Sequence, residues 1–560
     1  MRIKLVGLAS VLAFSCAREI RSGNPALWLE LQTEHFVLRT DLPESDARKA
    51  AADLELVRNA LLAARWQAKF VSRERITVTL LASHKELHEF VKSRLDGYAT
   101  RGIFGERLIV ASAEHGVLDS EVVKHELSHA LAQGYLVTNP RWMDEGLACY
   151  LETLEIDRDN MTATAGATGA HRRAYMRERE DRIRSYDWTD HVMGAGGAQP
   201  VPDGFDFETL SWGLVHWLID TRPEQFDAFV AGLAEGRTMW AAFDAAFPKV
   251  DEVLLEQEVP PYLLSLGYLA KKTFNVKPWT GEVAVRRLPL AQVYEVRTEI
   301  VGTARDEGQG DWKARLGQEL ELAREADPAN PFVVFLTEGA DPKVAVDAHP
   351  DDYRSWLVWF PQHPQDGAAI RKAVELAPAS GEALAMLAQY EQGLGQHEEA
   401  LQHVEEAARI MPDYRVFNIM AAIYYAQDRC SDSAAAQERA LSTLTDGEQP
   451  ALQFDLRTRL EEIVSRCKQI NVPASELERT PLVACRQQAD RTWGIIDSTW
   501  ARFTVGEDGR VSAVAVRGVQ DLHRAGSVRQ FVESCRFKPP LVDGKPHAVQ
   551  LDLAVARLKH

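Results

Sequence analysis

Hydrophobic residues recur along the first part of the chain with two different periods. Residues 36–40 and 76–81 have the pattern of strands, in which side chains alternate between two faces, and residues 108–111 form a short apolar run. Residues 44–66 instead place apolar side chains every three or four positions, which predicts a helix. Ser83 is of a type that caps helices, so another helix is expected to begin there. Residues 27–115 are therefore expected to alternate between strands and helices.

Two further helices are predicted over residues 120–133 and 141–153. No Gly or Pro interrupts the first, which ends before Gly134, and the second begins after Pro140. Both stretches carry apolar residues at helical spacing, so each has a face that can pack against the rest of the domain.

The first of these helices carries a candidate metal site. Residues four apart lie on one face of a helix, about 5–6 Å from each other, so His125 and His129 can converge on one Zn²⁺ ion. Glu126 is rotated off that face, where its carboxylate can reach a water on the metal. A catalytic zinc takes three protein ligands and keeps one position open. Glu145, in the second helix, is the candidate for the third ligand.

The second helix reads Trp-Met-Asp-Glu-Gly-Leu-Ala-Cys-Tyr over residues 142–150. Together with the preceding His-Glu-x-x-His, this resembles the gluzincin metallopeptidases, the thermolysin and aminopeptidase-like clan, and within it a bacterial subgroup with Trp-x-x-Glu-Gly-x-Ala-x-Tyr. The resemblance implies that His125, His129 and Glu145 bind one Zn²⁺ ion, and that Glu126 is the general base of peptide hydrolysis.

The same resemblance implies further parts of an active site. In gluzincins the sheet lies against the metal helix, and its edge strand, expected within residues 99–111, holds an extended peptide. The oxyanion of the reaction needs a donor, for which His216 and Tyr150 are candidates, with ordinary packed residues as the alternative. Cys149 stands where a carboxylate supporting the third ligand is expected, and it is interpreted as a small buried thiol.

The peptidase-like domain is expected to span residues 17–260. Residues 165–184 are rich in Arg and Glu with little apolar periodicity, which indicates a solvated helix or loop. The helical period returns over residues 207–233, which are expected to close the far side of a cleft. Residues 261–303 are expected to form a connecting segment.

Residues 304–470 contain a pattern that recurs after 34 residues. Pro378 and Pro412 have this spacing. Small or apolar residues recur at the same interval, namely Ala373, Ala407 and Leu441, and also Ala400 and Ala434. The pattern resembles tetratricopeptide repeats and implies an all-α solenoid whose concave surface binds a peptide or protein partner. A helical domain without repeats is the alternative.

Residues 475–560 return to the period of strands. Residues 500–505 and 511–516 alternate strictly on either side of a Gly-Glu-Asp-Gly turn, which predicts a hairpin. A helix over residues 525–535 and a last strand near residues 549–555 are expected to follow. This order, with Arg-Phe-x-Pro and Gly-x-Pro before the last strand, resembles the C-terminal domain of TonB-type energy transducers, and we interpret it as a small α+β binding module.

The N-terminus has the layout of an export signal. Arg2 and Lys4 precede an apolar run over residues 5–14 that is too short to span a bilayer. Cys16 follows where a bacterial lipoprotein signal is cleaved and the cysteine acylated. The resemblance implies a protein of the Gram-negative cell envelope, either an outer-membrane lipoprotein or periplasmic, whose membrane contact is made through a lipidated Cys16. Plain secretion is the alternative.

Charge and cysteine content narrow the class of protein further. The formal net charge of −18 repels phosphate backbones, which argues against nucleic-acid binding. The chain has six cysteines. In an exported protein, Cys485 with Cys535 and Cys430 with Cys467 are candidate disulfides, which leaves Cys149 free.

Together these features predict a multidomain protein with an α+β zincin-like peptidase domain, an all-α solenoid and a small α+β domain. The predicted function is hydrolysis of a peptide or protein substrate by a secreted or lipid-anchored zinc metallopeptidase with interaction modules. The alternative is a catalytically inactive lipoprotein scaffold, which binds protein partners through its repeats and its TonB-like domain.

Overall fold

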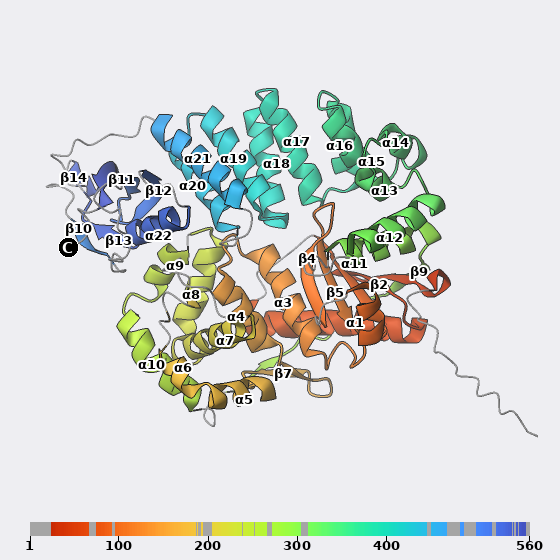
Figure 1. Ribbon diagram of the computed structural model, residues 1–560, viewed down its shortest axis with the longest axis horizontal. Coiled ribbons are helices and arrows are strands. Elements are labelled where there is room, and N and C mark those ends of the chain that lie inside the picture. Colours follow the sequence, from red (N-terminus) through yellow and green to blue (C-terminus); the bar gives the residue numbers. More distant parts are fainter. Residues whose placement is uncertain are drawn as a thin grey trace, which may run out of the picture.

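The computed structural model describes residues 24–66, 74–91, 96–185, 188, 192–193, 204–237, 239–250, 252–265, 271–303, 312–444, 450–466, 482–485, 500–517, 522–539, 541–542, 545–546 and 548–555. Within them the protein is multidomain, mostly helical, with several mixed or antiparallel sheets (Figure 1). The expected export signal with Cys16 lies outside the described residues, as does Cys467.

A six-stranded mixed sheet forms the centre of the first domain. Its strand order is β4-β5-β3-β2-β1-β9, and β2, β3 and β5 are parallel to one another. The strands are β1 (Leu29–Gln32), β2 (Phe36–Thr40), β3 (Ile76–Leu81), β4 (Gly97–Arg101), β5 (Arg107–Ser112) and β9 (Ala284–Arg287). The structure confirms the strands predicted at residues 36–40, 76–81 and 108–111. It adds β1, β4 and β9, with β4 as an antiparallel edge strand.

Helices cover both faces of this sheet. Helices α1 (Glu44–Leu61) and α3 (Glu121–Tyr135) pack on one face, and α2 (His84–Phe90) and α11 (Leu290–Thr303) pack on the other. Strands β3 and β5 are buried at every residue, because both of their faces are covered. Ser83 caps α2 as predicted, since its side chain accepts a hydrogen bond from the backbone N–H of Glu86.

A helical lobe follows α3 in the same domain. It comprises α4 (Arg141–Leu151), α5 (Ala170–Glu178), α6 (Glu180–Ser185), α7 (Gly204–Thr221), α8 (Pro223–Ala234), α9 (Met239–Ala246) and α10 (Glu252–Leu264), with a small sheet of β6 (Glu155–Asp157), β7 (Thr162–Ala165) and β8 (Lys272–Asn275). Gly146 lets α4 pack closely on α7, because a Cβ there would lie 2.6 Å from Val215 Cγ2.

Two predictions about this domain need correction. The segment 165–184 is not simply solvated, since α5 and α6 bury Met176, Ile183 and the Arg172 side chain. The expected connection over residues 261–303 contributes β8, β9 and α11 to the first domain. The first segment lacks a clear apolar period, whereas the buried Val293, Val296 and Ile300 of α11 recur at helical spacing.

The next part of the chain is a row of helices, here called the helical module. Neighbouring helices pack against each other in sequence order, and the row runs along the top of Figure 1. Its members are α12 (Trp312–Ala326), α13 (Pro331–Leu336), α14 (Lys343–Ala348), α15 (Tyr353–Trp359), α16 (Gly367–Leu376), α17 (Gly381–Gly393), α18 (His397–Ile410), α19 (Tyr414–Ala426), α20 (Cys430–Ser442) and α21 (Pro450–Arg466). Ala373, Ala400, Ala407 and Ala434 are all buried, and such small side chains let paired helices approach closely.

The C-terminal part forms a small α+β module. Its elements are β10 (Leu482–Cys485), β11 (Trp500–Val505), β12 (Val511–Arg517), α22 (Leu522–Glu533), β13 (Cys535–Phe537), β14 (Leu541–Val542), β15 (Lys545–Pro546) and β16 (Val549–Ala554). The predicted hairpin is confirmed as β11 and β12, and β16 pairs with β11 on its other side. A disulfide joins Cys485 to Cys535, the pairing expected, and Cys149 is free and buried. The pairing of Cys430 with Cys467 lies outside the described residues.

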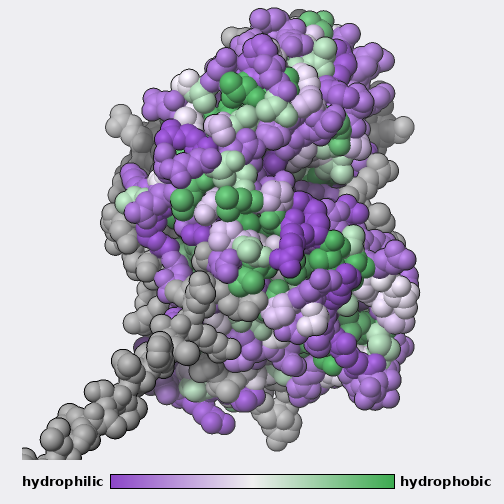
Figure 2. All heavy atoms as spheres, turned by 90° about the vertical axis from the view of Figure 1, so that its right-hand side faces the viewer, coloured by the Kyte–Doolittle hydropathy of each residue, from purple (hydrophilic) through white to green (hydrophobic). Residues whose placement is uncertain are grey.

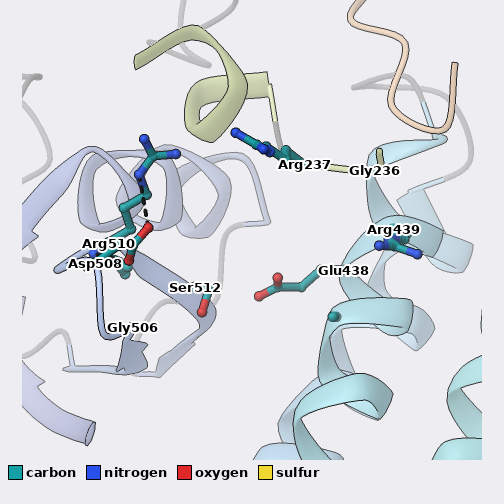
Figure 3. Close-up of a pocket in the computed structure, with 10 residues that line it drawn as sticks. Gly236, Arg237, Glu438, Arg439, Gly506, Asp508, Arg510 and Ser512 are labelled. Carbon is teal, nitrogen blue, oxygen red and sulfur yellow. Dashed lines mark hydrogen bonds and ion pairs between the residues drawn. The ribbon is translucent and has the colours of Figure 1, made fainter. Parts of the chain in front are cut away.

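The three parts of the chain meet around a polar cavity of about 520 Å³ (Figure 3). Arg439 of α20 donates a hydrogen bond of 3.2 Å to the carbonyl oxygen of Glu235, which follows α8. Arg536 of the C-terminal module pairs with Asp244 of α9 at 2.7 Å. The Glu438 carboxylate accepts a hydrogen bond from the backbone N–H of Ala513. Polar contacts thus hold the C-terminal module against both other parts.

On the face that carries α12 and α14, small hydrophobic patches lie scattered among hydrophilic residues (Figure 2). Phe335 and Val344, both of the helical module, are among the exposed apolar side chains. In the described ranges, no helix has the length and apolar character needed to cross a membrane.

Candidate metal centre

The structure brings the three expected ligands together between α3 and α4. His125 Nε2 and His129 Nε2 lie 3.1 Å apart, and Glu145 Oε2 lies 3.7 Å from the first nitrogen and 3.6 Å from the second. Ligand atoms about 2.0–2.1 Å from a tetrahedral Zn²⁺ ion are about 3.3 Å from one another. The two imidazoles and the carboxylate therefore fit one such ion with small side-chain adjustments.

The three side chains are enclosed but remain accessible. Their exposed fractions are 16% for His125, 11% for His129 and 27% for Glu145. A site of this kind retains contact with solvent, as a catalytic zinc with an open fourth position requires. The donor set of two imidazoles and one carboxylate is also that of known catalytic zinc sites.

Two carboxylates orient the histidine rings from the side opposite the centre. Asp144 Oδ2 lies 2.9 Å from His129 Nδ1, and Glu152 Oε2 lies 3.0 Å from His125 Nδ1. Arg172 of α5 in turn donates a hydrogen bond of 2.9 Å to the other oxygen of Glu152. Each imidazole thus presents Nε2 to the centre while a carboxylate lies beside its Nδ1, the arrangement typical of metal-binding histidines.

These three orienting residues were not identified from the sequence. Asp144 directly precedes Glu145, and Glu152 directly follows the last residue of α4, so both are near the motif in the chain. Their nearness to Glu145 is the only signal available, because the contacts depend on how α4 packs against α3. Arg172 has no such signal, since it belongs to the Arg-rich segment expected to be solvated.

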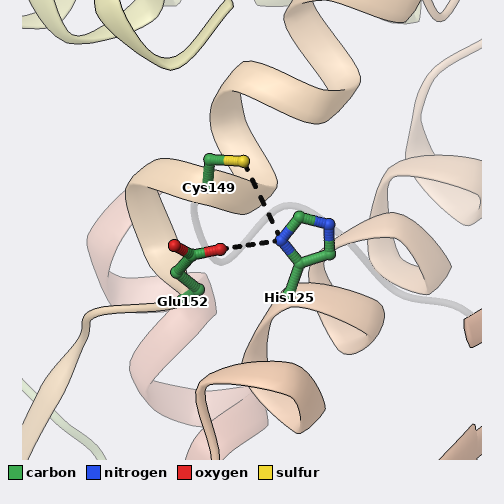
Figure 4. Close-up of side chains that lie close together, drawn as sticks. All are labelled: His125, Cys149 and Glu152. Carbon is green, nitrogen blue, oxygen red and sulfur yellow. Dashed lines mark hydrogen bonds and ion pairs between the residues drawn. The ribbon is translucent and has the colours of Figure 1, made fainter. Parts of the chain in front are cut away.

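Cys149 lies on the same side of His125 as Glu152 (Figure 4). Its Sγ atom is 4.0 Å from His125 Nδ1. Burial raises the pKa of this thiol. Cys149, Glu152 and His125 form a second group close enough to share an ion, but that group would use Nδ1 of His125 rather than Nε2. Glu152, one turn after Cys149, supplies a carboxylate to His125 rather than to the third ligand Glu145.

Glu126 lies beside the histidines and faces the edge of the sheet. Burial raises the pKa of its carboxyl group, and the neighbouring His125 and His129 oppose this effect. The backbone amide of Ala99 in β4 lies close enough to the carboxylate to lower its pKa. The edge strand expected within residues 99–111 is thus β4, residues 97–101, whereas β5 lies inside the sheet.

Neighbouring carboxylates raise the pKa of both histidines. Burial lowers the pKa of His129, but Asp144 outweighs burial and raises the pKa to about 9. Burial likewise lowers the pKa of His125, while Cys149, Glu145 and Glu152 raise it well above its usual value. Because a proton on Nε2 competes with a metal ion, metal binding at neutral pH would release protons.

The two candidate oxyanion donors are not part of this group. His216 of α7 is fully buried, with Nδ1 2.7 Å from the Tyr262 hydroxyl and Nε2 3.2 Å from the Gly166 carbonyl oxygen. Tyr150 is also buried, and its ring packs edge-on against that of His216 at 5.1 Å between centroids. Both side chains therefore have the surroundings of packed core residues.

Comparisons with known proteins leave the function open. No family model matches the chain, and no curated protein matches it. Among solved structures, a monomeric mutant of IFIT1 with m7Gppp-AAAA gives a TM-score of 0.26 at 12% sequence identity, over 64% of this chain and 76% of that chain. A TM-score this low assigns neither fold nor function.

Proposed function

We propose that the protein is a zinc-dependent peptide hydrolase of the gluzincin kind. The observation that carries the proposal is the convergence of His125 Nε2, His129 Nε2 and Glu145 Oε2, each within 4 Å of the other two. The orienting carboxylates Asp144 and Glu152 support it, because a scaffold without a metal has no need to hold both rings in this orientation.

The proposed mechanism divides the work among four residues. His125, His129 and Glu145 hold the ion, which when bound supplies Lewis acidity and a water of lowered pKa. Glu126 accepts the proton from the attacking water and then delivers it to the departing amine. Burial of Glu126 favours its protonated form, so the carboxyl group can carry the proton between the two steps.

The edge strand β4 is the proposed binding site for the substrate backbone. The N–H of Ala99 points to Glu126 and therefore away from β5. Peptide groups alternate in direction along an antiparallel strand, so those of Gly97 and Arg101 point to the same open edge. An extended peptide that added to this edge would lie next to the general base.

The other modules are proposed to resemble known interaction domains. The packed helix pairs with buried alanines support a tetratricopeptide-like solenoid. The hairpin, helix and last strand of the C-terminal module support the likeness to TonB C-terminal domains. A disulfide within that module is consistent with an oxidising compartment and hence with the proposed location in a Gram-negative cell envelope.

The proposed function is tested by digesting a peptide library with the purified protein. We expect a chelator to abolish cleavage and added Zn²⁺ to restore it. The ligands are partly exposed, so a bound metal ion can exchange with the solution. Mass spectrometry of the products also distinguishes endopeptidase from exopeptidase cleavage. Cleavage that persists after complete removal of metal would contradict the proposal.

A further inference from the structure

The turn between β4 and β5 is buried in the helical module. The hairpin register places Arg101 opposite Arg107, so residues 102–106 form the turn. Turns of hairpins usually lie in solvent, but here Phe104 is only 5% exposed. Its side chain belongs to a hydrophobic cluster built from the helical module, with Phe332, Leu357, Ile370 and Leu387 among the members. Figure 1 shows the hairpin running up from the sheet toward the row of helices.

Contacts tie this turn to several helices at once. The Phe104 ring packs against Phe335 of α13 with 5.6 Å between centroids, and the Arg354 guanidinium of α15 lies 5.7 Å from the centre of the same ring. Gly105 has a φ of +86° and passes so close to the end of α18 that a Cβ would lie 3.0 Å from Met411 Sδ. The turn thus packs against α13, α15 and the residue that follows α18.

Polar groups close the turn and fix its base. Arg101 Nη1 donates a hydrogen bond of 2.9 Å to the Gly105 carbonyl oxygen. The Phe104 backbone N–H donates one of 3.1 Å to Glu106. Arg101 also interacts electrostatically with Glu382 and Asp413 of the helical module. Hydrogen bonds therefore fix the conformation of the turn, and the positive charge of Arg101 faces acidic residues of the helical module.

The body of β4 is held next to the candidate active site. The Tyr98 hydroxyl donates a hydrogen bond of 3.1 Å to the Ile300 carbonyl oxygen in α11. Gly97 is so near α3 that a Cβ would lie 2.6 Å from Val122 Cγ1. The Ala99 backbone amide lies near the Glu126 carboxylate. One short strand thus lies beside the general base at its middle residue and leads at its end into the turn held by the helical module.

We propose that the helical module clamps the edge strand β4, and that Phe104 is a positioning residue for substrate binding. Holding the turn against the helical module keeps the open edge of β4 straight and close to Glu126, ready to pair with an extended peptide. This consequence for substrates rests on the proposed peptidase function, whereas the clamp itself does not.

The clamp is tested by hydrogen exchange at residues 97–101 in Phe104→Ala. Removal of a buried phenyl ring is expected to speed exchange in β4 by about tenfold or more. Phe104→Leu should restore most of the protection. The matched control is Phe417→Ala, because Phe417 is 1% exposed in a separate cluster of the same module. Unchanged exchange in β4 of Phe104→Ala, or an equal rise in Phe417→Ala, would overturn the proposal.

Enzyme kinetics then separate the clamp from the proposed function. In Phe104→Ala we expect the same zinc content and a KM raised by about tenfold, with a smaller change in kcat, because binding and not chemistry is disturbed. If the wild-type protein hydrolyses nothing, the proposed function fails while the exchange experiment still decides on the clamp. An unaltered KM in Phe104→Ala would contradict the positioning role. Should Phe104→Ala fail to fold, Gly105→Ala takes its place, because the added Cβ would lie 3.0 Å from Met411 Sδ and displace the turn. Exchange in β4 is then expected to rise, and unchanged exchange would overturn the proposal.

Discussion

Replacing Glu126 with Gln is expected to lower kcat by about 10²–10⁴-fold, the usual contribution of a positioned general base. Gln has nearly the shape of Glu but cannot accept a proton from the attacking water. Zinc content should stay at the wild-type value, because Glu126 is not a member of the ligand group formed by His125, His129 and Glu145. Initial rates on a peptide substrate and metal analysis of the same preparation measure both effects.

The matched control for this variant is Glu121→Gln. Glu121 lies in the first turn of the same helix, α3, and is exposed to solvent. Its substitution removes the same charge from the same helix and should leave kcat near that of the wild type. Hydrolysis by Glu126→Gln within about tenfold of the wild-type rate would show that another group carries the proton.

Replacing His129 with Ala is expected to remove both bound zinc and activity. The change leaves two of the three proposed ligands, and even residues that only orient a ligand contribute about 10–100-fold to metal affinity. The loss for a direct ligand should therefore exceed about 100-fold. The variant also removes the imidazole that lies beside both Asp144 and Glu145, so each carboxylate loses its contact with His129. Elemental analysis after dialysis against a weak chelator measures the loss.

His349→Ala provides the control for the loss of an imidazole. His349 lies at the end of α14 in the helical module and pairs with Asp327 at 2.9 Å. Its removal should leave zinc content and activity unchanged. Equal zinc in His129→Ala and in the wild type would favour the alternative function, a lipoprotein scaffold that binds partners through its other modules.

The candidate ligands could be predicted from the sequence because their geometry is mostly local. His125 and His129 are one helical turn apart on α3, so their convergence follows from helix geometry alone. Glu145 was expected from the resemblance of its motif, and the packing of α4 on α3 brings its carboxylate to the imidazoles. The long periodic helices and the alternating strands were predictable for the same local reason.

The residues that orient the ligands could not be predicted, because their roles arise only from packing. Glu152, at the end of α4, contacts His125 of α3, and Arg172 of α5 contacts Glu152. The sequence around a charged residue in an Arg- and Glu-rich stretch does not indicate whether its side chain is buried or solvated. The burial of Arg172 is thus visible only in the folded protein.

The bounds of the edge strand and the burial of its turn escaped prediction for a related reason. Residues 97–101 have no strong alternation, and their strand conformation depends on pairing with β5. The apolar pair Ile103 and Phe104 between two glycines was a signal that this turn is buried. The helices that bury it lie more than two hundred residues later in the chain, so its partner could not be inferred.

X-ray absorption at the zinc edge of the zinc-loaded protein tests the central claim most directly. The account predicts one zinc per chain with only nitrogen and oxygen neighbours at about 2.0–2.1 Å, from His125, His129, Glu145 and a solvent molecule. A sulfur neighbour at about 2.3 Å would place the ion on the Cys149 side of His125 and contradict the account. Failure to bind one zinc ion per chain would contradict it equally.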